Sequence, residues 1–190
     1  SDFARERLRP LTPGVLLAFA SIAFGFGYDV SSKAASQYAD EIKIRFGLDV
    51  KIVSAPREAV RGCDIVVTAG PILKKPHATI PAGWLTEGTF ASLVDYDSYW
   101  HREAIKETDK FCTDDTPQFF FAREKRGCFQ DIPEIYADLG ELATGQKPGR
   151  ETPTERTMAA NLGLAISDLA VASLLYQKAL EKGIGTTLPL

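Results

Sequence analysis

Short apolar runs rich in β-branched residues alternate with helical segments along most of the chain. Within residues 32–46 the apolar side chains recur at helical spacing, and Gly47 follows where a helix C-cap is expected. Residues 50–53 and 63–69 are of strand type, and a helical turn that begins at Pro56 separates them. Strands that alternate with helices in this way are typical of a parallel α/β fold.

The alternation continues through the second half of the chain. A loop rich in Gly, Pro and Thr covers residues 144–154, and an apolar pattern of helical length follows it. The expected elements are strands over 88–94 and 110–113 and helices over 103–108, 117–125 and 158–182. The sequence therefore predicts a Rossmann-like α/β fold, in which helices flank a parallel sheet and a long helix ends the chain.

The composition argues against several classes of protein. A chain of 190 residues that is 45% hydrophobic is long enough to bury a core. Its 22 basic and 25 acidic residues give a net charge of -3 without a basic block, which argues against nucleic-acid binding. Three cysteines without CxxC spacing and two histidines support neither a disulfide framework nor a metal site, and they fit a reducing, cytoplasmic setting. Residues 5–27 are basic and then apolar like a secretory signal, but a buried strand explains this run equally well, so no membrane segment is expected.

A stretch with two glycines at residues 23–35 reads AFGFGYDVSSKAA. Gly25 and Gly27 have the spacing of the first two glycines in the dinucleotide-binding GxGxxG turn, but Val30 occupies the third position. An apolar strand, then Asp29, then serines suited to capping a helix instead match the second strand of that fold, whose acid holds the ribose hydroxyls. An ordinary surface turn at Asp29 is the alternative interpretation.

This placement of Asp29 predicts NAD as the cofactor, because the carboxylate would repel the 2′-phosphate of NADP. The phosphate-binding turn should then lie about 20 residues upstream, before about residue 5. The sequence contains no such turn. Either residues 2–8 form the helix that follows the turn, or the first unit of the fold is atypical.

Five segments in order carry a further signal. They are YDVSSKAA (28–35), AVRGCDIVVTAGP (59–71), VDYDSYW (94–100), DLGELATGQKPGR (138–150) and NLGLAISDLAVASLLYQKALEKGIGTTLPL (161–190). Together they resemble the ornithine cyclodeaminase/mu-crystallin family, from about residue 25 to residue 190. The resemblance implies an ornithine cyclodeaminase, an amino-acid dehydrogenase or an imine reductase that uses a nicotinamide cofactor.

The resemblance also implies roles for particular residues. Asp97 matches an aspartate that the family places near the nicotinamide as the acid/base, and a carboxylate tuned by burial can move a proton there. A structural Asp97 that caps the turn before Glu103 is the alternative. The expected cofactor-binding residues are Asp29, Val30, Ser31, Thr68, Ala69, Gly70, Val94, Asn161, Leu162 and Gly163. Two alternatives explain the small residues without a cofactor. Residues 68–70 can form an ordinary transition from a strand to a loop, and Gly163 can permit tight packing of the last helix.

The resemblance, together with the placement of Asp29, therefore implies an NAD-dependent oxidoreductase or cyclodeaminase that acts on an amino acid or a cyclic imine. Residues 1–155 are expected to form the dinucleotide-binding domain, with a first unit that is atypical or truncated. Residues 156–190 are expected to form a helix that packs toward a substrate domain, supplied by a homodimer partner or an N-terminal half. Asp95, Tyr96 and Tyr99 depart from the family pattern and leave the substrate open. A cofactor- or small-ligand-binding module without turnover, or an inactive portion of such an enzyme, is the alternative.

Overall fold

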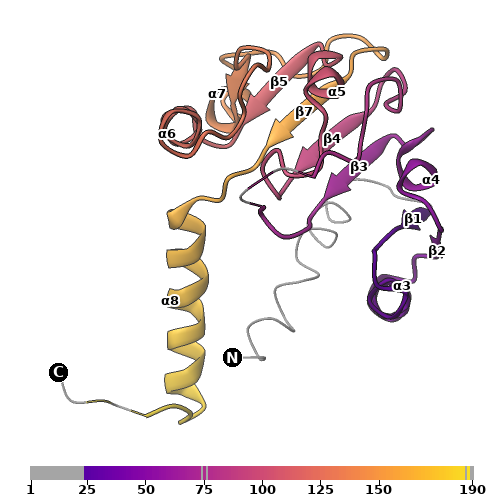
Figure 1. The fold of residues 1–190 in the computed structure, drawn as a ribbon. Helices are drawn as coiled ribbons and strands as arrows, with labels where there is room; N and C mark the ends of the chain where they lie inside the picture. The colour runs from indigo at the N-terminus through magenta and orange to yellow at the C-terminus, as the bar shows by residue number, and fades with distance from the viewer. Residues whose placement is uncertain (1–23, 74, 76, 187, 189–190) are drawn as a thin grey trace. The chain divides into compact units, whose positions relative to one another are not determined.

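The computed structural model describes residues 24–73, 75, 77–186 and 188 of the chain (Figure 1). The chain divides into two compact units, Ser1–Cys63 and Asp64–Leu190. The helix expected over residues 2–8 and the apolar run before residue 24 lie outside the described residues. The expected domain boundary at residue 155 stays a prediction.

In its described residues, the first unit combines two short parallel strands with two helices. Its described elements are β1 (Gly25–Gly27), α3 (Ser32–Phe46), β2 (Val50–Ile52) and α4 (Pro56–Val60). Strand β1 lies parallel to β2, with Gly27 opposite Ile52. Ala35 and Ile42 form the buried face of α3. The predicted helix and the strand after it are thereby confirmed, and β1 belongs to a parallel sheet as expected.

The second unit is built on a five-stranded parallel sheet in the order β3-β4-β7-β5-β6. The strands are β3 (Ile65–Thr68), β4 (Phe90–Leu93), β5 (Lys110–Thr113), β6 (Ala137–Asp138) and β7 (Thr157–Ala160). The helices are α5 (Arg102–Lys106), α6 (Thr116–Arg126), α7 (Leu139–Ala143) and α8 (Ala165–Glu181). The predicted α/β fold, with a Rossmann-like parallel sheet, flanking helices and a long C-terminal helix, is therefore confirmed.

Strand β7 corrects one expectation from the sequence. The apolar pattern over 158–182 predicted a single helix, whereas Thr157–Ala160 is a strand and the helix starts only at Ala165. Strand β7 lies between β4 and β5 and pairs with both. A strand that is buried on both faces is apolar throughout, so periodicity alone does not distinguish it from a buried helix.

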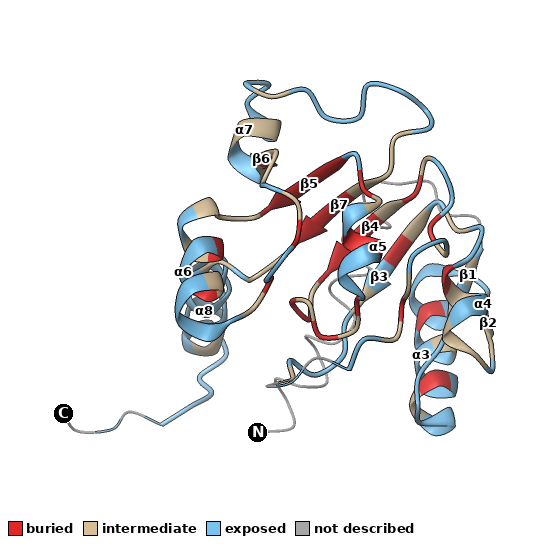
Figure 2. Ribbon diagram, turned by 45° about the horizontal axis from the view of Figure 1, so that its top comes forward, coloured by how far each residue is buried: buried red, intermediate tan, exposed pale blue. Residues whose placement is uncertain are grey.

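The core of the second unit surrounds the central strands β4, β7 and β5, which are largely red in Figure 2. Leu93 of β4 and Met158 of β7 are almost completely buried. The ring of Phe119 on α6 lies 5.9 Å from that of Phe111 on β5 and 4.7 Å from that of Phe129, measured between ring centroids. Full burial of a large apolar side chain contributes about 1.5–3 kcal/mol, so these residues anchor α6 to the sheet.

Lys110 ties the loop over residues 144–154 to β5. Its ammonium nitrogen lies 2.6 Å from a carboxylate oxygen of Glu151 and 2.6 Å from the carbonyl oxygen of Gly149. It also lies 5.0 Å from the centroid of the Tyr136 ring. A buried ammonium group is costly unless it is paired, and these contacts fix the segment that leads into β7.

Gly88 lies in the turn before β4 with a φ of +79°, and a Cβ atom there would lie 2.5 Å from the carbonyl oxygen of Pro153. We predict that Gly88→Ala lowers the free energy of unfolding by about 3 kcal/mol, because left-handed strain and a clash with backbone act together. Gly83→Ala is the matched control, since its φ is +78° and a Cβ atom there meets nothing within 4 Å. The control should lose only about 1 kcal/mol in urea unfolding curves. Equal losses for the two variants would contradict the clash.

Helix α8 has no buried residue. The large apolar side chains exposed along it are Ile166, Leu169, Val171, Leu174, Leu175, Tyr176 and Leu180. An exposed apolar surface of this kind is typical of a protein interface. In the described part of the chain, no helix is both long and apolar enough to cross a bilayer.

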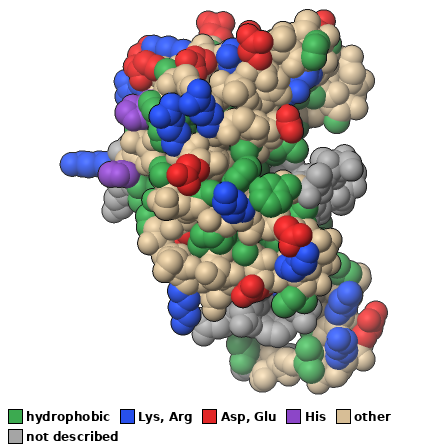
Figure 3. All heavy atoms as spheres, turned by 90° about the vertical axis from the view of Figure 1, so that its right-hand side faces the viewer, with side chains coloured by type: hydrophobic (Ala, Val, Ile, Leu, Met, Phe, Trp, Pro, Cys, Tyr) green, Lys and Arg blue, Asp and Glu red, His purple; other side chains and the backbone are tan. Residues whose placement is uncertain are grey.

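The charges on the surface are mixed. On the face shown in Figure 3, basic and acidic side chains are interspersed, with apolar side chains between them. Lys43 with Asp49 and Lys106 with Asp131 form exposed ion pairs, with nitrogen–oxygen distances of 2.6 and 2.8 Å. This pattern differs from the continuous basic stripe of nucleic-acid-binding proteins.

Candidate functional site

The carboxyl ends of four neighbouring strands meet at one edge of the sheet in the second unit, here called the carboxyl edge. Thr68 ends β3 opposite Leu93 of β4, and both Leu93 and Thr113 of β5 lie opposite Ala160 of β7. Open parallel α/β sheets bind their ligands outside these strand ends. The predicted site residues at or just after the strand ends are Thr68, Ala69, Gly70, Val94, Asp97, Asn161, Leu162 and Gly163.

Asp95 holds the segment after β3. This residue follows β4 and has no exposed surface. Its Oδ1 accepts a hydrogen bond from the hydroxyl of Thr68 at 2.9 Å, and its Oδ2 accepts one from the backbone N–H of Gly70 at 3.1 Å. Trp100 donates through Nε1 to the same Thr68 hydroxyl at 3.0 Å. Burial raises the pKa of Asp95, and the two hydrogen bonds that its carboxylate accepts oppose that rise.

Tyr99 covers the same segment. A Cβ atom on Gly70 would lie 2.5 Å from the Tyr99 ring, so the ring approaches the backbone at a distance that only glycine permits. The Tyr99 hydroxyl donates to the carbonyl oxygen of Pro71 at 3.1 Å. The N–H of Val94 donates to the carbonyl oxygen of Thr68 at 2.9 Å and extends the pairing of β3 with β4. Tyr99, which replaces a proline of the family pattern, therefore helps to shape the backbone after β3.

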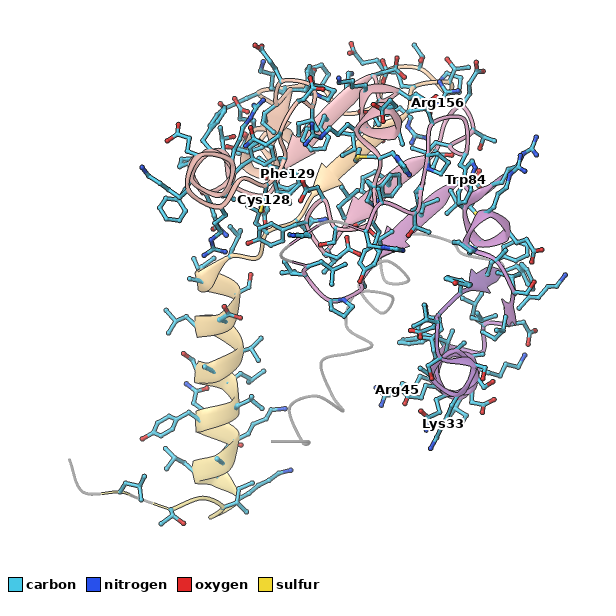
Figure 4. The ribbon with its side chains drawn as sticks, viewed as in Figure 1. Lys33, Arg45, Trp84, Cys128, Phe129 and Arg156 are labelled. Atoms are coloured by element: carbon cyan, nitrogen blue, oxygen red, sulfur yellow. The ribbon has the colours of Figure 1, made fainter. Side chains whose placement is uncertain are left out.

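Asp97 lies two residues beyond Asp95 in a partly buried position. Its Oδ2 accepts a hydrogen bond at 2.7 Å from the backbone N–H of Phe129, which Figure 4 labels in the segment after α6. Phe129 is buried with a φ of 53°, and its ring stacks on that of Tyr96 with centroids 5.7 Å apart. Burial, together with the charge of Asp97, raises the pKa of the neighbouring Cys128 thiol. The hydrogen bond from Phe129 orients the Asp97 carboxylate. Its donor lies 32 residues further along the chain and not in the turn that follows Asp97.

Two polar side chains after β5 hold the segment after β7. The N–H of Gly163 donates to Oδ2 of Asp114 at 2.7 Å, and Nε2 of Gln118 donates to the Gly163 carbonyl oxygen at 3.0 Å. Nδ2 of Asn161 donates to the hydroxyl of Ser92 at 2.9 Å. Gly163 has a φ of +89°, and a Cβ atom there would meet nothing within 4 Å. Its backbone conformation, and not tight helix packing, therefore accounts for the glycine.

The predicted residues Asp29, Val30 and Ser31 connect β1 to α3 in the first unit. Oδ1 of Asp29 accepts a hydrogen bond from the N–H of Ser31 at 2.7 Å, which orders the turn. Ser31 is the N-cap of α3, and its hydroxyl oxygen accepts from the N–H of Ala34 at 3.3 Å. Val30 is 93% exposed. The strand, the acid and the helix cap expected from the sequence are all present, and the three residues are exposed.

The sequence reasoning assigned no role to Asp95, Asp114, Gln118 or Phe129. The two aspartates follow the ends of β4 and β5. Because open parallel sheets bind their ligands at such strand ends, this position could have indicated a role at the site. Gln118 and Phe129 carry no such signal, because their bonds join positions 45 and 32 residues apart.

Known proteins similar to this chain include one enzyme compared by sequence and two solved structures. An alanine dehydrogenase from Archaeoglobus fulgidus is 32% identical over 167 residues, which cover 84% of this chain and 50% of that protein. The structure of a Delta(1)-pyrroline-2-carboxylate reductase from Thermococcus litoralis, in complex with NADH and L-proline, is 28% identical with a TM-score of 0.74. The match covers 93% of this chain and 56% of that one. A dimeric archaeal alanine dehydrogenase with bound NAD is 30% identical with a TM-score of 0.73, covering 94% and 56% of the two chains.

The family is established by the extent of the similarity. The sequence pattern of the ornithine cyclodeaminase/mu-crystallin family matches residues 21–183. The chain spans about half the length of the curated relatives it matches. The resemblance inferred from five sequence segments is thereby confirmed, and the chain belongs to the ornithine cyclodeaminase/mu-crystallin family.

Proposed function

We propose that the chain is the nicotinamide-binding part of an oxidoreductase or cyclodeaminase that acts on an amino acid or a cyclic imine. The observation that carries the proposal is Asp97 at the carboxyl edge, a partly buried carboxylate oriented by the backbone of Phe129. The relatives support the substrate class, because one is an alanine dehydrogenase and another was solved with NADH and L-proline.

Each unit by itself has residues that suit a part of a nicotinamide dinucleotide. Ala69 and Gly70 are exposed and small, so a planar ring can approach their backbone on the side away from the Tyr99 ring. Residues 161–163 offer a second short segment there, fixed by Asp114. Asp29 presents an exposed carboxylate just before a helix, which suits the two hydroxyls of a ribose. NAD is proposed over NADP, because this carboxylate would repel a 2′-phosphate. When bound, the cofactor supplies hydride transfer.

Asp97 is proposed to move the proton of the reaction. Its carboxylate can take a proton from a substrate amine or from an attacking water, and it can return that proton to an imine. The hydrogen bond from Phe129 keeps the carboxylate in one orientation. Asp95 and Asp114 fix the segments on both sides, so the groups around the reacting atoms are positioned before substrate binds.

Helix α8 is proposed to pack toward a substrate domain, within a homodimer or with an N-terminal half. The apolar side chains exposed along the helix support this role. The archaeal alanine dehydrogenase is described as a dimer. A cytoplasmic setting is also part of the proposal, on the cysteine usage of the sequence alone.

Titration of the full chain with NADH, followed by cofactor fluorescence, tests the proposal. We expect saturable binding of NADH and weaker binding of NADPH. Cofactor absorbance then measures turnover with alanine, proline, lysine, ornithine and a cyclic imine. Binding without turnover of any of them would favour a cofactor-binding module, the second candidate. Lack of NADH binding would contradict both candidates.

A further inference from the structure

The carboxylate of Asp95 is enclosed by the protein at the carboxyl edge, where the cofactor is proposed to bind. Burying a charged group without partners is strongly unfavourable, so a buried carboxylate needs donors for both of its oxygens. Both donors lie at the end of β3 or just after it: the hydroxyl of Thr68, which ends the strand, and the backbone N–H of Gly70. The stability of the buried charge is therefore linked to the conformation of that segment.

The direction of each hydrogen bond follows from the chemistry of the groups. The indole N–H of Trp100 is only a donor, so the Thr68 hydroxyl oxygen accepts from it. The proton of that hydroxyl is then directed at Oδ1 of Asp95, and the Gly70 N–H is directed at Oδ2. Both bonds to the carboxyl group point toward its oxygens. In this arrangement both oxygens of the carboxyl group act as acceptors, one for each donor of the segment.

Thr68 is held by its pairing with β4, but the two residues after it have few other anchors. Ala69 and Gly70 are exposed and have almost no side chain, so apolar packing cannot fix their backbone. The Tyr99 ring lies against Gly70, and the Tyr99 hydroxyl holds the carbonyl oxygen of Pro71. Small residues permit the close approach of a flat ligand. Because their side chains are too small to fix the backbone by packing, hydrogen bonds to the backbone must hold the segment. Asp95 supplies such a bond from the interior.

We propose that Asp95 is a positioning residue for the cofactor, which fixes the backbone of residues 68–70 so that the cofactor binds against a preformed surface. This inference rests on the proposed function, since it concerns the affinity for the cofactor proposed above. Asp95 contacts the segment and acts through it. A preformed surface raises affinity because the protein does not lose conformational freedom in this segment when the ligand binds.

The exchange Asp95→Asn tests this role in the full chain with NADH as the probe. Asparagine keeps an oxygen for the Thr68 hydroxyl but places an amide NH₂ against the N–H of Gly70, so the bond to Gly70 is lost. We expect the Kd for NADH to rise about tenfold, the usual effect of losing one hydrogen bond to a charged group. Asp64→Asn is the matched control, because it exchanges an exposed aspartate just before the amino end of the same strand β3. Its Kd should equal that of the wild type.

A variant of Thr68, alone and combined with Asp95→Asn, separates positioning from a general loss of structure. Thr68→Val removes the hydroxyl that bonds to Asp95 and should bind NADH more weakly than the wild type. Because both side chains act on one segment, combining Thr68→Val with Asp95→Asn should weaken binding less than the two single effects predict. Each Kd is measured well below the melting temperature of that variant, recorded by circular dichroism.

The outcomes distinguish the inference from the proposed function. If the wild type binds NADH and Asp95→Asn binds it equally well, with only the melting temperature lowered, Asp95 is purely structural and the inference is overturned. Fully additive effects of Asp95→Asn and Thr68→Val would overturn it as well. A wild-type chain that does not bind NADH would overturn the proposed function and this inference together.

Discussion

Asp97→Asn is expected to reduce turnover by about 100-fold or more, the usual range for removing a general acid or base. Asparagine has the shape of aspartate, and its side-chain oxygen can still accept the hydrogen bond from the N–H of Phe129. The loop after α6 should therefore keep its position, while the group that exchanges the proton is gone. The kcat for the most active substrate of the panel, measured by cofactor absorbance, gives the effect.

The binding of NADH separates this loss from a structural defect. Asp97→Asn should bind NADH within about twofold of the wild type, because the change affects the chemical step and not ground-state binding. Asp131→Asn is the control, since it exchanges an exposed aspartate of the same loop region that pairs with Lys106. Its turnover should be that of the wild type. Full turnover by Asp97→Asn would show that the bond to Phe129 is the whole role of Asp97.

The local elements of the fold could be predicted from the sequence because their signals are local. The run Ile65–Thr68 is β-branched and forms β3. Ser31 and Gly47 lie at the two ends of a periodic segment and become the N-cap and C-cap of α3. The position of Thr157–Ala160 at the centre of the sheet could not be predicted, because it depends on pairing with strands that are far away along the chain.

The candidate site also combines residues that the sequence indicates with contacts that it does not indicate. Asp97 could be proposed from the sequence because it follows a strand and matches a family segment, and its role stays a prediction. Its partner Phe129 was not found, since a hydrogen bond from a backbone N–H depends on the path of the loop and not on the type of residue. The sequence marked Asp95 only as a residue that departs from the family pattern, without a role for its carboxylate. Its contacts with Thr68 and Gly70 join segments 27 and 25 residues apart, which no spacing rule relates.

Asp29→Asn is expected to shift the choice between the two nicotinamide cofactors. The carboxylate is proposed to accept from the ribose hydroxyls of NADH and to repel the 2′-phosphate of NADPH, and asparagine removes the charge behind both effects. The ratio of the NADPH Kd to the NADH Kd should therefore fall on the order of 100-fold, because weaker NADH binding and stronger NADPH binding both lower it. Fluorescence titrations with the two reduced cofactors measure this ratio.

The choice of asparagine preserves the local structure. Its side-chain oxygen can still accept from the N–H of Ser31, so the turn into α3 should remain. Asp40→Asn, which exchanges an exposed aspartate on α3, is the control for a general change of charge and should leave the ratio unaltered. An unaltered ratio in Asp29→Asn as well would reduce Asp29 to a surface turn residue whose role is its bond to Ser31. Cofactor choice would then have to come from residues other than Asp29, because this carboxylate is the basis on which NAD is proposed over NADP.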